Sequence, residues 1–211
     1  MSDESATEEY VRTDEQQLEP DGEQETERPQ LDPETAARRR AALDHVRQWG
    51  DPVLTTRARP VDSFDDGLRE EVYRMGALMN DALGIGLAAT QVGILHRVLV
   101  YRVEPDSPVQ ALINPELEWA GKEKEIADEG CLSLQGVLVE VERPVHVRVR
   151  AQDTHGDPVL VEASGLEARV IQHEMDHLDG VLILDRTSRD QRKAAVRGLR
   201  EAAQAAAADQ A

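Results

Sequence analysis

A stretch in the C-terminal part of the chain carries two histidines and a glutamate at the spacing of a metal site. His173 and His177 are four residues apart, so on a helix they share one face and can present two imidazoles to one metal ion. Glu174 lies beside them as a base for a metal-bound water, an arrangement that suits hydrolysis. The same H-E-x-x-H pattern also arises by chance on charged helices with solvated histidines. The pattern therefore makes the chain a candidate metalloenzyme.

A catalytic metal site of this kind needs three protein ligands and one open position for water, so one ligand is missing from the helix. Cys131, the only cysteine in the chain, is the natural candidate. A lone cysteine is more often a small buried apolar residue. Three features favour a ligand: Cys131 lies between two expected strands, Gly130 lets the backbone approach closely, and the two histidines of the helix still lack a third ligand.

The elements that must position these residues are predicted from hydrophobic periodicity. Apolar residues recur at helical spacing over residues 64–83, and alternate or run together in several short segments. The pattern predicts an α+β fold with mixed or antiparallel strands packed around a central helix that carries the H-E-x-x-H motif. A C-terminal helix follows. The expected strands are 97–103, 110–119, 137–141, 145–151 and 158–163; the expected helices are 64–83, 165–178 and 188–207, with a further helix-prone stretch from Pro33 toward Trp49.

Composition excludes several classes of protein. The 211-residue chain has a net charge of −18, which argues against nucleic acid as a partner because phosphate binding needs a concentrated positive surface. The chain has no run of 18 or more apolar residues, so no membrane span is expected, and the N-terminus lacks the pattern of a secretory signal. A single cysteine fits a reducing compartment, so we expect a cytoplasmic protein.

The first part of the chain differs in composition from the rest. Residues 1–33 are rich in Glu, Asp, Gln, Thr and Pro and hold few large apolar groups, so we expect a disordered acidic extension. Residues 34–190 then form the catalytic domain, and residues 191–211 a C-terminal helix and tail. A monomer is expected.

Three separated segments resemble the signature segments of the peptide deformylases, in the same order along the chain. They are Gly84-Ile85-Gly86-Leu87-Ala88-Ala89-Thr90-Gln91, Glu129-Gly130-Cys131-Leu132-Ser133 and Gln172-His173-Glu174-Met175-Asp176-His177-Leu178-Asp179-Gly180. The similarity covers roughly residues 45–190. The first segment also looks like a dinucleotide-binding loop, but it follows a helix instead of a strand and has no suitable βαβ unit around it.

The resemblance implies hydrolysis of the N-terminal formyl group of formyl-methionyl nascent polypeptides, with release of formate. It assigns Cys131, His173 and His177 as ligands of one divalent metal ion, commonly Fe²⁺ in this family, with Ni²⁺, Co²⁺ or Zn²⁺ tolerated. Glu174 then takes a proton from the metal-bound water and delivers it to the leaving nitrogen. The resemblance also implies that the Gln91 side-chain amide and the Leu132 backbone N–H donate hydrogen bonds to the oxygen of the tetrahedral intermediate.

The substrate's methionine side chain requires an apolar pocket. Ile85, Leu166 and Val170 are candidate walls, although ordinary core packing explains them equally well. Gly86 and Gly130 would let a peptide strand lie close to the enzyme backbone. The chain departs from the common family pattern at Gln135, Leu138 and Glu142, which bears on how the peptide is held and leaves the metal ligands intact.

Two other functions fit parts of the pattern. Another H-E-x-x-H hydrolase, such as a peptidase, would share the helix but not Cys131 or the Gly84–Gln91 segment. A non-catalytic relative that binds formylated N-termini or the ribosome would not need Cys131, His173, Glu174, His177 and Gln91 all intact. The C-terminal helix is a candidate contact with the ribosome, or simply a solvated helix packed on the domain.

Overall fold

A computed structural model describes residues 31–208 of the chain. The chain order is α1 (Pro33–Leu43), η1 (Pro52–Thr55), α2 (Asp66–Asp81), β1 (Gly86–Ala88), η2 (Ala89–Val92), β2 (Val98–Tyr101), β3 (Gln110–Ala120), β4 (Lys124–Cys131), β5 (Leu134–Pro144), β6 (His146–Gln152), β7 (Pro158–Ser164), α3 (Gly165–Leu178), α4 (Ile183–Arg186) and α5 (Arg189–Ala208). The expected α+β class is confirmed.

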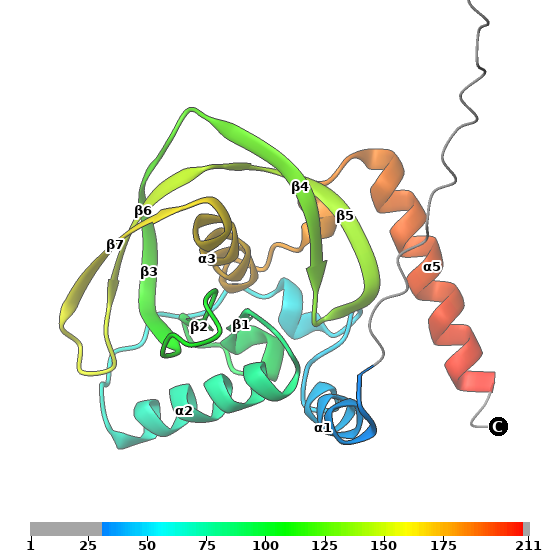
Figure 1. Ribbon diagram of the computed structural model, residues 1–211, viewed down its shortest axis with the longest axis horizontal. Coiled ribbons are helices and arrows are strands. Elements are labelled where there is room, and N and C mark those ends of the chain that lie inside the picture. Colours follow the sequence, from blue (N-terminus) through cyan, green and yellow to red (C-terminus); the bar gives the residue numbers. More distant parts are fainter. Residues whose placement is uncertain (1–30, 209–211) are drawn as a thin grey trace, which may run out of the picture. The chain divides into compact units, whose positions relative to one another are not determined.

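The strands form two antiparallel groups that bend around one helix (Figure 1). One sheet has the order β1-β2-β3-β6-β7, and β4 pairs with β5 as a separate hairpin inserted between β3 and β6. The helix α3 packs against strands of both groups, among them β1, β2, β5 and β7. Its buried face includes Ala168 and Ile171, which lie in one core cluster with Leu99 and Val149 of the sheet. The sheet therefore supports the helix that carries the H-E-x-x-H motif.

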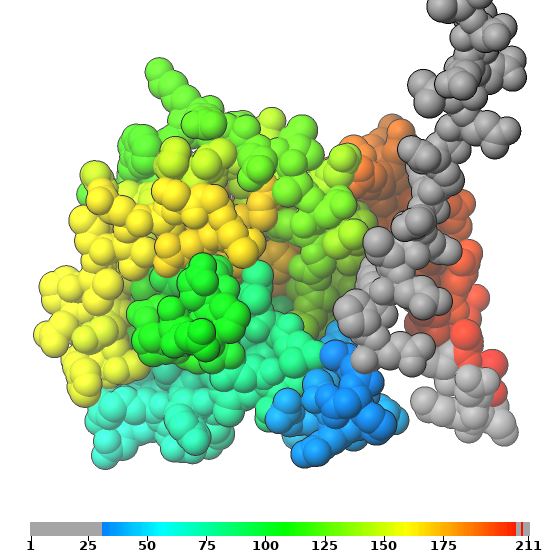
Figure 2. All heavy atoms as spheres, in the orientation of Figure 1, coloured from blue at the N-terminus to red at the C-terminus, as the bar shows by residue number. Residues whose placement is uncertain are grey.

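The helix α2 covers another part of the same sheet. Its apolar residues Leu68, Met75 and Met79 form a second cluster with Val98 and Val100 of β2, as the period of the sequence indicates. Asp65 caps the helix by accepting a hydrogen bond from the Leu68 N–H at 3.1 Å. The two helices α1 and α2 contact each other, and Figure 2 shows them side by side along the lower edge of the face in view.

The helix α3 covers the same residues, 165–178, as the sequence predicts. It ends where Gly180 adopts a φ of +74°, a conformation that side chains disfavour. A Cβ at Gly180 would also lie 2.7 Å from the Thr55 carbonyl oxygen. Glycine is thus required here for two independent reasons, and the chain can turn directly from the motif helix into α4.

The end of the first helix and two of the strands differ from the predictions. The first helix ends at Leu43 instead of continuing toward Trp49, and the N–H groups of Arg47 and Trp49 donate to the carbonyls of Gln91 and Ser133. The strands β1 and β4 were not predicted. The expected disordered extension, residues 1–33, lies almost entirely outside the described residues; only its end is seen, where Asp32 caps α1 through the N–H groups of Glu34 and Thr35.

Candidate metal centre

Three potential ligand atoms converge between α3 and the end of β4. His173 and His177 lie one turn apart on α3, and Cys131 is the last residue of β4. One ligand atom from each of the three residues lies within 4.8 Å of the others. The Cys131 Sγ is 3.2 Å from the His177 Nε2. The structure thus brings together the three ligands that the sequence predicts.

The donor set fits a divalent metal ion. Nitrogen and sulfur ligands around a tetrahedral ion are about 3.6 Å apart, given metal–ligand bonds of roughly 2.1 and 2.3 Å. The Cys131 Sγ–His177 Nε2 distance of 3.2 Å is slightly below that value, and all three ligand atoms lie within 4.8 Å of one another. Beside them the buried Glu174 Oε2 has no hydrogen-bond partner within residues 31–208. A thiolate and two imidazoles suit iron, nickel, cobalt or zinc and do not distinguish among them.

The carboxylate of Glu129 fixes the orientation of the first histidine. Its Oε2 lies 2.9 Å from the His173 Nδ1, which leaves the Nε2 of that ring for the metal. The sequence predicted no role for Glu129, because the strand β4 that carries both Glu129 and Cys131 was not predicted.

Buried arginines hold Glu129 in turn. Arg143 donates to both of its oxygens, at 2.6 and 2.9 Å, and Arg169 donates to Oε1 at 2.8 Å. Arg143 also donates to Asp176 Oδ2 at 2.9 Å. Asp176 belongs to the motif helix and further accepts from Arg186 of α4. An ion-pair network of buried and half-buried groups therefore connects the His173 side of the cluster to α4.

Two buried carboxylates in this region have very different pKa values. Burial would raise the pKa of Glu129, but hydrogen bonds from His173 and Arg143 outweigh it and lower the pKa to about 2. Burial dominates at Glu174 and raises its pKa to about 7. Burial also holds the pKa of His177 well below its usual value. Near neutral pH, Glu174 can therefore gain or lose a proton while Glu129 stays charged.

The glutamate of the motif rests on Gly86. A Cβ at this position would lie only 2.4 Å from the Glu174 Oε1, so any larger residue would displace the carboxylate. The structure thus shows close approach of an enzyme side chain at Gly86. The expected approach of the substrate backbone to Gly86 stays a prediction.

The side chain of Gln91 also lies beside the ligand cluster. It lies on η2 and is 1% exposed. Its Oε1 accepts from the Ala88 N–H at 2.8 Å, which directs the Nε2 toward the cluster. That Nε2 lies 3.2 Å from the Ser133 Oγ and 3.5 Å from the Cys131 Sγ. Gln91 is thus placed as a donor beside the candidate ligands.

Leu132 lies in the turn between β4 and β5, directly after Cys131. Within the part of the chain that the structure describes, no group accepts a hydrogen bond from the Leu132 N–H. Gly130 precedes Cys131 and is exposed, and a Cβ there would meet only ordinary contacts with Val137 and Leu138 of the facing strand. Space for a side chain therefore does not by itself require glycine at position 130.

Of the three candidate pocket residues, Ile85 directly precedes β1, and Leu166 and Val170 lie on α3. Leu166 and Ile85 are about half exposed, and Val170 is buried. Leu166 lines a cavity of about 580 Å³ together with Arg102, whose N–H donates to the Ile85 carbonyl at 2.8 Å. Val170 lies one turn after Leu166 and one turn before Glu174 on α3. It also belongs to the core cluster, so core packing accounts for it as well.

The three departures from the common pattern lie on β5 and are exposed. Leu138 faces Gly130 across the hairpin, and Glu142 forms an exposed ion pair with Lys124 at 2.8 Å. None of the three contacts the ligand cluster in the described hydrogen bonds and ion pairs. Among residues 31–208, no helix combines the length and apolar character that a bilayer crossing requires.

The fold and the three-ligand cluster beside a buried glutamate define a candidate metalloenzyme of the H-E-x-x-H class. Comparison with known proteins narrows this class. The sequence model of the family described as polypeptide deformylase matches residues 43–193. The chain is 46% identical over 157 residues to a peptide deformylase of Parafrankia sp., covering 74% of this chain and 85% of that protein. It is 52% identical over 141 residues to a peptide deformylase of Thermotoga neapolitana, covering 67% and 85% respectively.

A solved structure agrees with these matches. A peptide deformylase of Synechococcus elongatus in complex with actinonin superposes with a TM-score of 0.70 at 43% identity, covering 72% of this chain and 85% of that chain. This chain belongs to the polypeptide deformylase family, and it is an enzyme.

Proposed function

We propose that this chain removes the formyl group from the N-terminus of formyl-methionyl nascent polypeptides and releases formate. The observation that carries the proposal is the convergence of the Cys131, His173 and His177 ligand atoms beside Glu174. Family membership supports the reaction class. A divalent metal ion held by these three residues, with Fe²⁺ proposed as the native ion, would supply the Lewis acidity that makes water a nucleophile near neutral pH.

Glu174 moves the proton in this proposal. Its Oε2 takes a proton from the attacking water as the water oxygen bonds to the formyl carbon. The same oxygen then delivers the proton to the amide nitrogen as the carbon–nitrogen bond breaks, leaving formate and a free amine. A pKa of about 7 suits both steps, because a general base and acid works best when its pKa is near the operating pH.

Two donors stabilise the charge that develops on the formyl oxygen. The Gln91 amide is held by the Ala88 N–H and directed at the cluster. The Leu132 N–H lies one residue beyond Cys131 at the turn. Removing one such donor typically lowers the rate about a hundredfold or more, because the charge appears only in the transition state.

The substrate pocket and partners form a further part of the proposal. Ile85, Leu166 and Val170 form the walls for the methionine side chain, with Gly86 and Gly130 along the peptide. The enzyme acts in the cytoplasm as a monomer.

We also propose that α5 contacts the ribosome. Co-sedimentation of the protein with ribosomes measures this contact. The exposed basic residues of α5 are Arg189, Arg192, Lys193, Arg197 and Arg200.

The test is formate release from formyl-Met-Ala-Ser by protein loaded with iron or nickel without oxygen. We expect turnover by the wild type. The Glu174→Ala variant should lose at least about a hundredfold in kcat, the usual contribution of a general base, and still bind metal. Full activity of that variant would disprove the role of Glu174. Release of amino acids would indicate a peptidase, and inactivity of the wild type with every metal would indicate a binding protein.

A further inference from the structure

The segment Val46–Trp49 joins the two parts of the chain that carry the proposed oxyanion donors. The Arg47 N–H donates to the carbonyl of Gln91 at 2.7 Å. The Trp49 N–H donates to the carbonyl of Ser133 at 2.9 Å. Gln91 and Ser133 are 42 residues apart and belong to η2 and the β4–β5 turn respectively. The Val46–Trp49 segment is therefore a direct link between them.

Apolar side chains anchor this segment at both ends. Val46 is 4% exposed and lies in a core cluster against which Leu132 packs. Trp49 packs against a different cluster, to which Cys131 also contributes. Because each anchor shares a cluster with a residue of the turn, movement of the segment would be transmitted to the turn.

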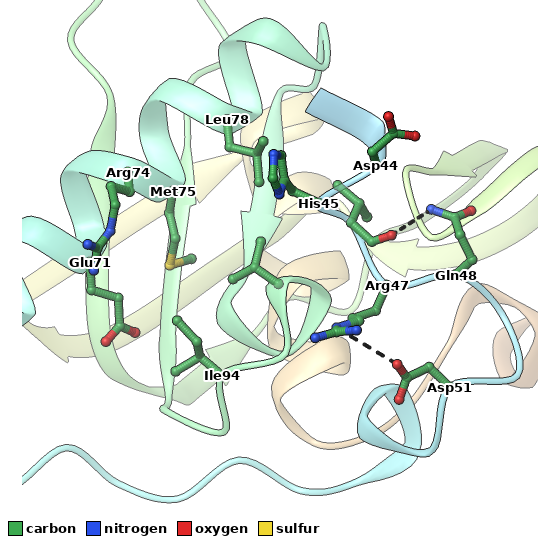
Figure 3. Close-up of a pocket in the computed structure, with 12 residues that line it drawn as sticks. Asp44, His45, Arg47, Gln48, Asp51, Glu71, Arg74, Met75, Leu78 and Ile94 are labelled. Carbon is green, nitrogen blue, oxygen red and sulfur yellow. Dashed lines mark hydrogen bonds and ion pairs between the residues drawn. The ribbon is translucent and has the colours of Figure 1, made fainter. Parts of the chain in front are cut away.

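Gln48 lies between these anchors and bonds directly to the turn. Its Nε2 donates to the Leu132 carbonyl at 3.2 Å and to the Val46 carbonyl at 3.0 Å. Both neighbours are acceptors, so the amide nitrogen must face them. Gln48 lines a cavity of about 600 Å³, and the dashed line at Gln48 in Figure 3 marks one of its hydrogen bonds. None of Cys131, His173, Glu174 and His177 lines that cavity.

We propose that Gln48 is a positioning residue for the deformylation reaction. Peptide units are planar, so the direction of the Leu132 N–H depends on rotation about the φ and ψ of the neighbouring residues. Gln48 holds the Leu132 carbonyl, and Trp49 holds the next carbonyl along the chain. Together these bonds fix the turn so that the Leu132 N–H stays directed toward the reacting oxygen. The inference rests on the proposed function.

The expected effect is confined to kcat. An oxyanion donor acts on charge that exists only in the transition state, so misplacing it slows turnover and leaves substrate binding almost unchanged. Complete removal of a donor lowers kcat by about 10²–10³, and a displaced donor retains part of that contribution. We therefore expect roughly a tenfold fall in kcat with KM within about twofold of the wild type.

The experiment compares three variants of the full-length protein. Gln48→Met keeps the length of the side chain and removes both donors. Gln48→Glu keeps the shape and places a carboxylate against two carbonyl oxygens, so its kcat should fall further. Gln152→Met is the matched control, since it removes a part-buried amide that donates to the Gly156 carbonyl at 3.2 Å in the β6–β7 turn. The measurements are kcat and KM for formate release, and hydrogen exchange of backbone amides over residues 130–136 with and without metal.

We expect lower kcat and faster amide exchange over residues 130–136 in the two Gln48 variants. In Gln152→Met, both kcat and exchange should match the wild type. Unchanged kcat and exchange in Gln48→Met would overturn it, and so would a rise in KM alone. The absorption spectrum of the Co²⁺-loaded variants should match the wild type, since the thiolate ligand is not touched; a changed spectrum would mean that Gln48 acts on the metal cluster and would overturn the proposal. Absence of formate release from the wild type would instead refute the proposed function, while the exchange result would still test the contact.

Discussion

At the scale of single residues, environment gives two similar side chains opposite roles. Glu129 and Glu174 are both buried. The Glu129 carboxylate lies 2.9 Å from the His173 Nδ1, and Glu174 directly follows His173 in the chain. Hydrogen bonds and guanidinium groups hold the pKa of Glu129 at about 2, and burial raises that of Glu174 to about 7. A permanently charged carboxylate orients a ligand, and one that titrates near neutral pH can transfer a proton.

Replacing Glu129 with glutamine should weaken both metal binding and folding. The neutral amide cannot balance Arg143 and Arg169, and unpaired buried charge typically costs about 3 kcal/mol or more of unfolding free energy. Loss of the carboxylate behind a histidine ligand typically lowers metal affinity about 10- to 100-fold. Chelator competition and urea unfolding measure these two quantities.

The control for this prediction is Glu162→Gln. Glu162 pairs with Arg148 at 2.6 Å, but both side chains are exposed. Exposed pairs contribute about 1 kcal/mol or less, so this variant should stay close to the wild type in both assays. If Glu129→Gln behaved like Glu162→Gln, the network would not support the metal cluster.

At the scale of elements, one helix serves both the core and the cluster. One face of α3 packs Ala168 and Ile171 against the sheet, and another presents His173 and His177 to Cys131. The hairpin β4–β5 supplies Cys131 from the other side. The C-terminal helix α5 packs through Ala195, Val196 and Leu199 on the cluster that also includes Leu134 of β5.

Glycine substitutions should separate a helix interior from a helix end. Gly198 lies within α5, and a Cβ there would meet nothing within 4 Å. The Gly198→Ala variant should therefore gain about 0.5–1 kcal/mol of unfolding free energy. Gly180→Ala should lose stability, because its φ is +74° and the Cβ would meet the Thr55 backbone. Thermal or urea unfolding measures the stability of both variants. Equal effects of the two substitutions would contradict the prediction.

At the scale of the whole molecule, α5 offers basic side chains on a strongly acidic protein. The chain carries a net charge of −18, yet α5 exposes Lys193, Arg197 and Arg200. The proposed ribosome contact would use these cations, and its strength should fall as salt rises. Nothing in the proposed reaction requires these residues, so binding and turnover should be separable.

The double variant Arg197→Glu/Arg200→Glu should co-sediment with ribosomes less than the wild type at low salt, while kcat for formate release stays unchanged. The double variant Arg57→Glu/Arg74→Glu changes net charge equally at exposed positions elsewhere. It should co-sediment like the wild type. Equal loss in both variants would indicate a general charge effect instead of a contact through α5.

The sequence was most informative where local chemistry specifies structure. The apolar period of α2 and α3 and the alternation in β6 predicted these elements within a few residues, because each buries one face against the sheet. The strand β4 was missed because seven of its eight residues are at least partly exposed and it lacks an apolar face. Its extended form depends on pairing with β5, 3 to 20 residues further along the chain.

The sequence by itself determined the candidate ligands, the glutamate base and the family, since residue types, their spacing on one helix and three separated segments carry that information. Only the tertiary structure decided which groups support them. The bonds of Glu129 to His173 and of Gln48 to Leu132 join residues 44 and 84 positions apart. Hydrophobic periodicity along the sequence cannot indicate such contacts, because they form only when the sheet, the hairpin and the segment before η1 pack against one another.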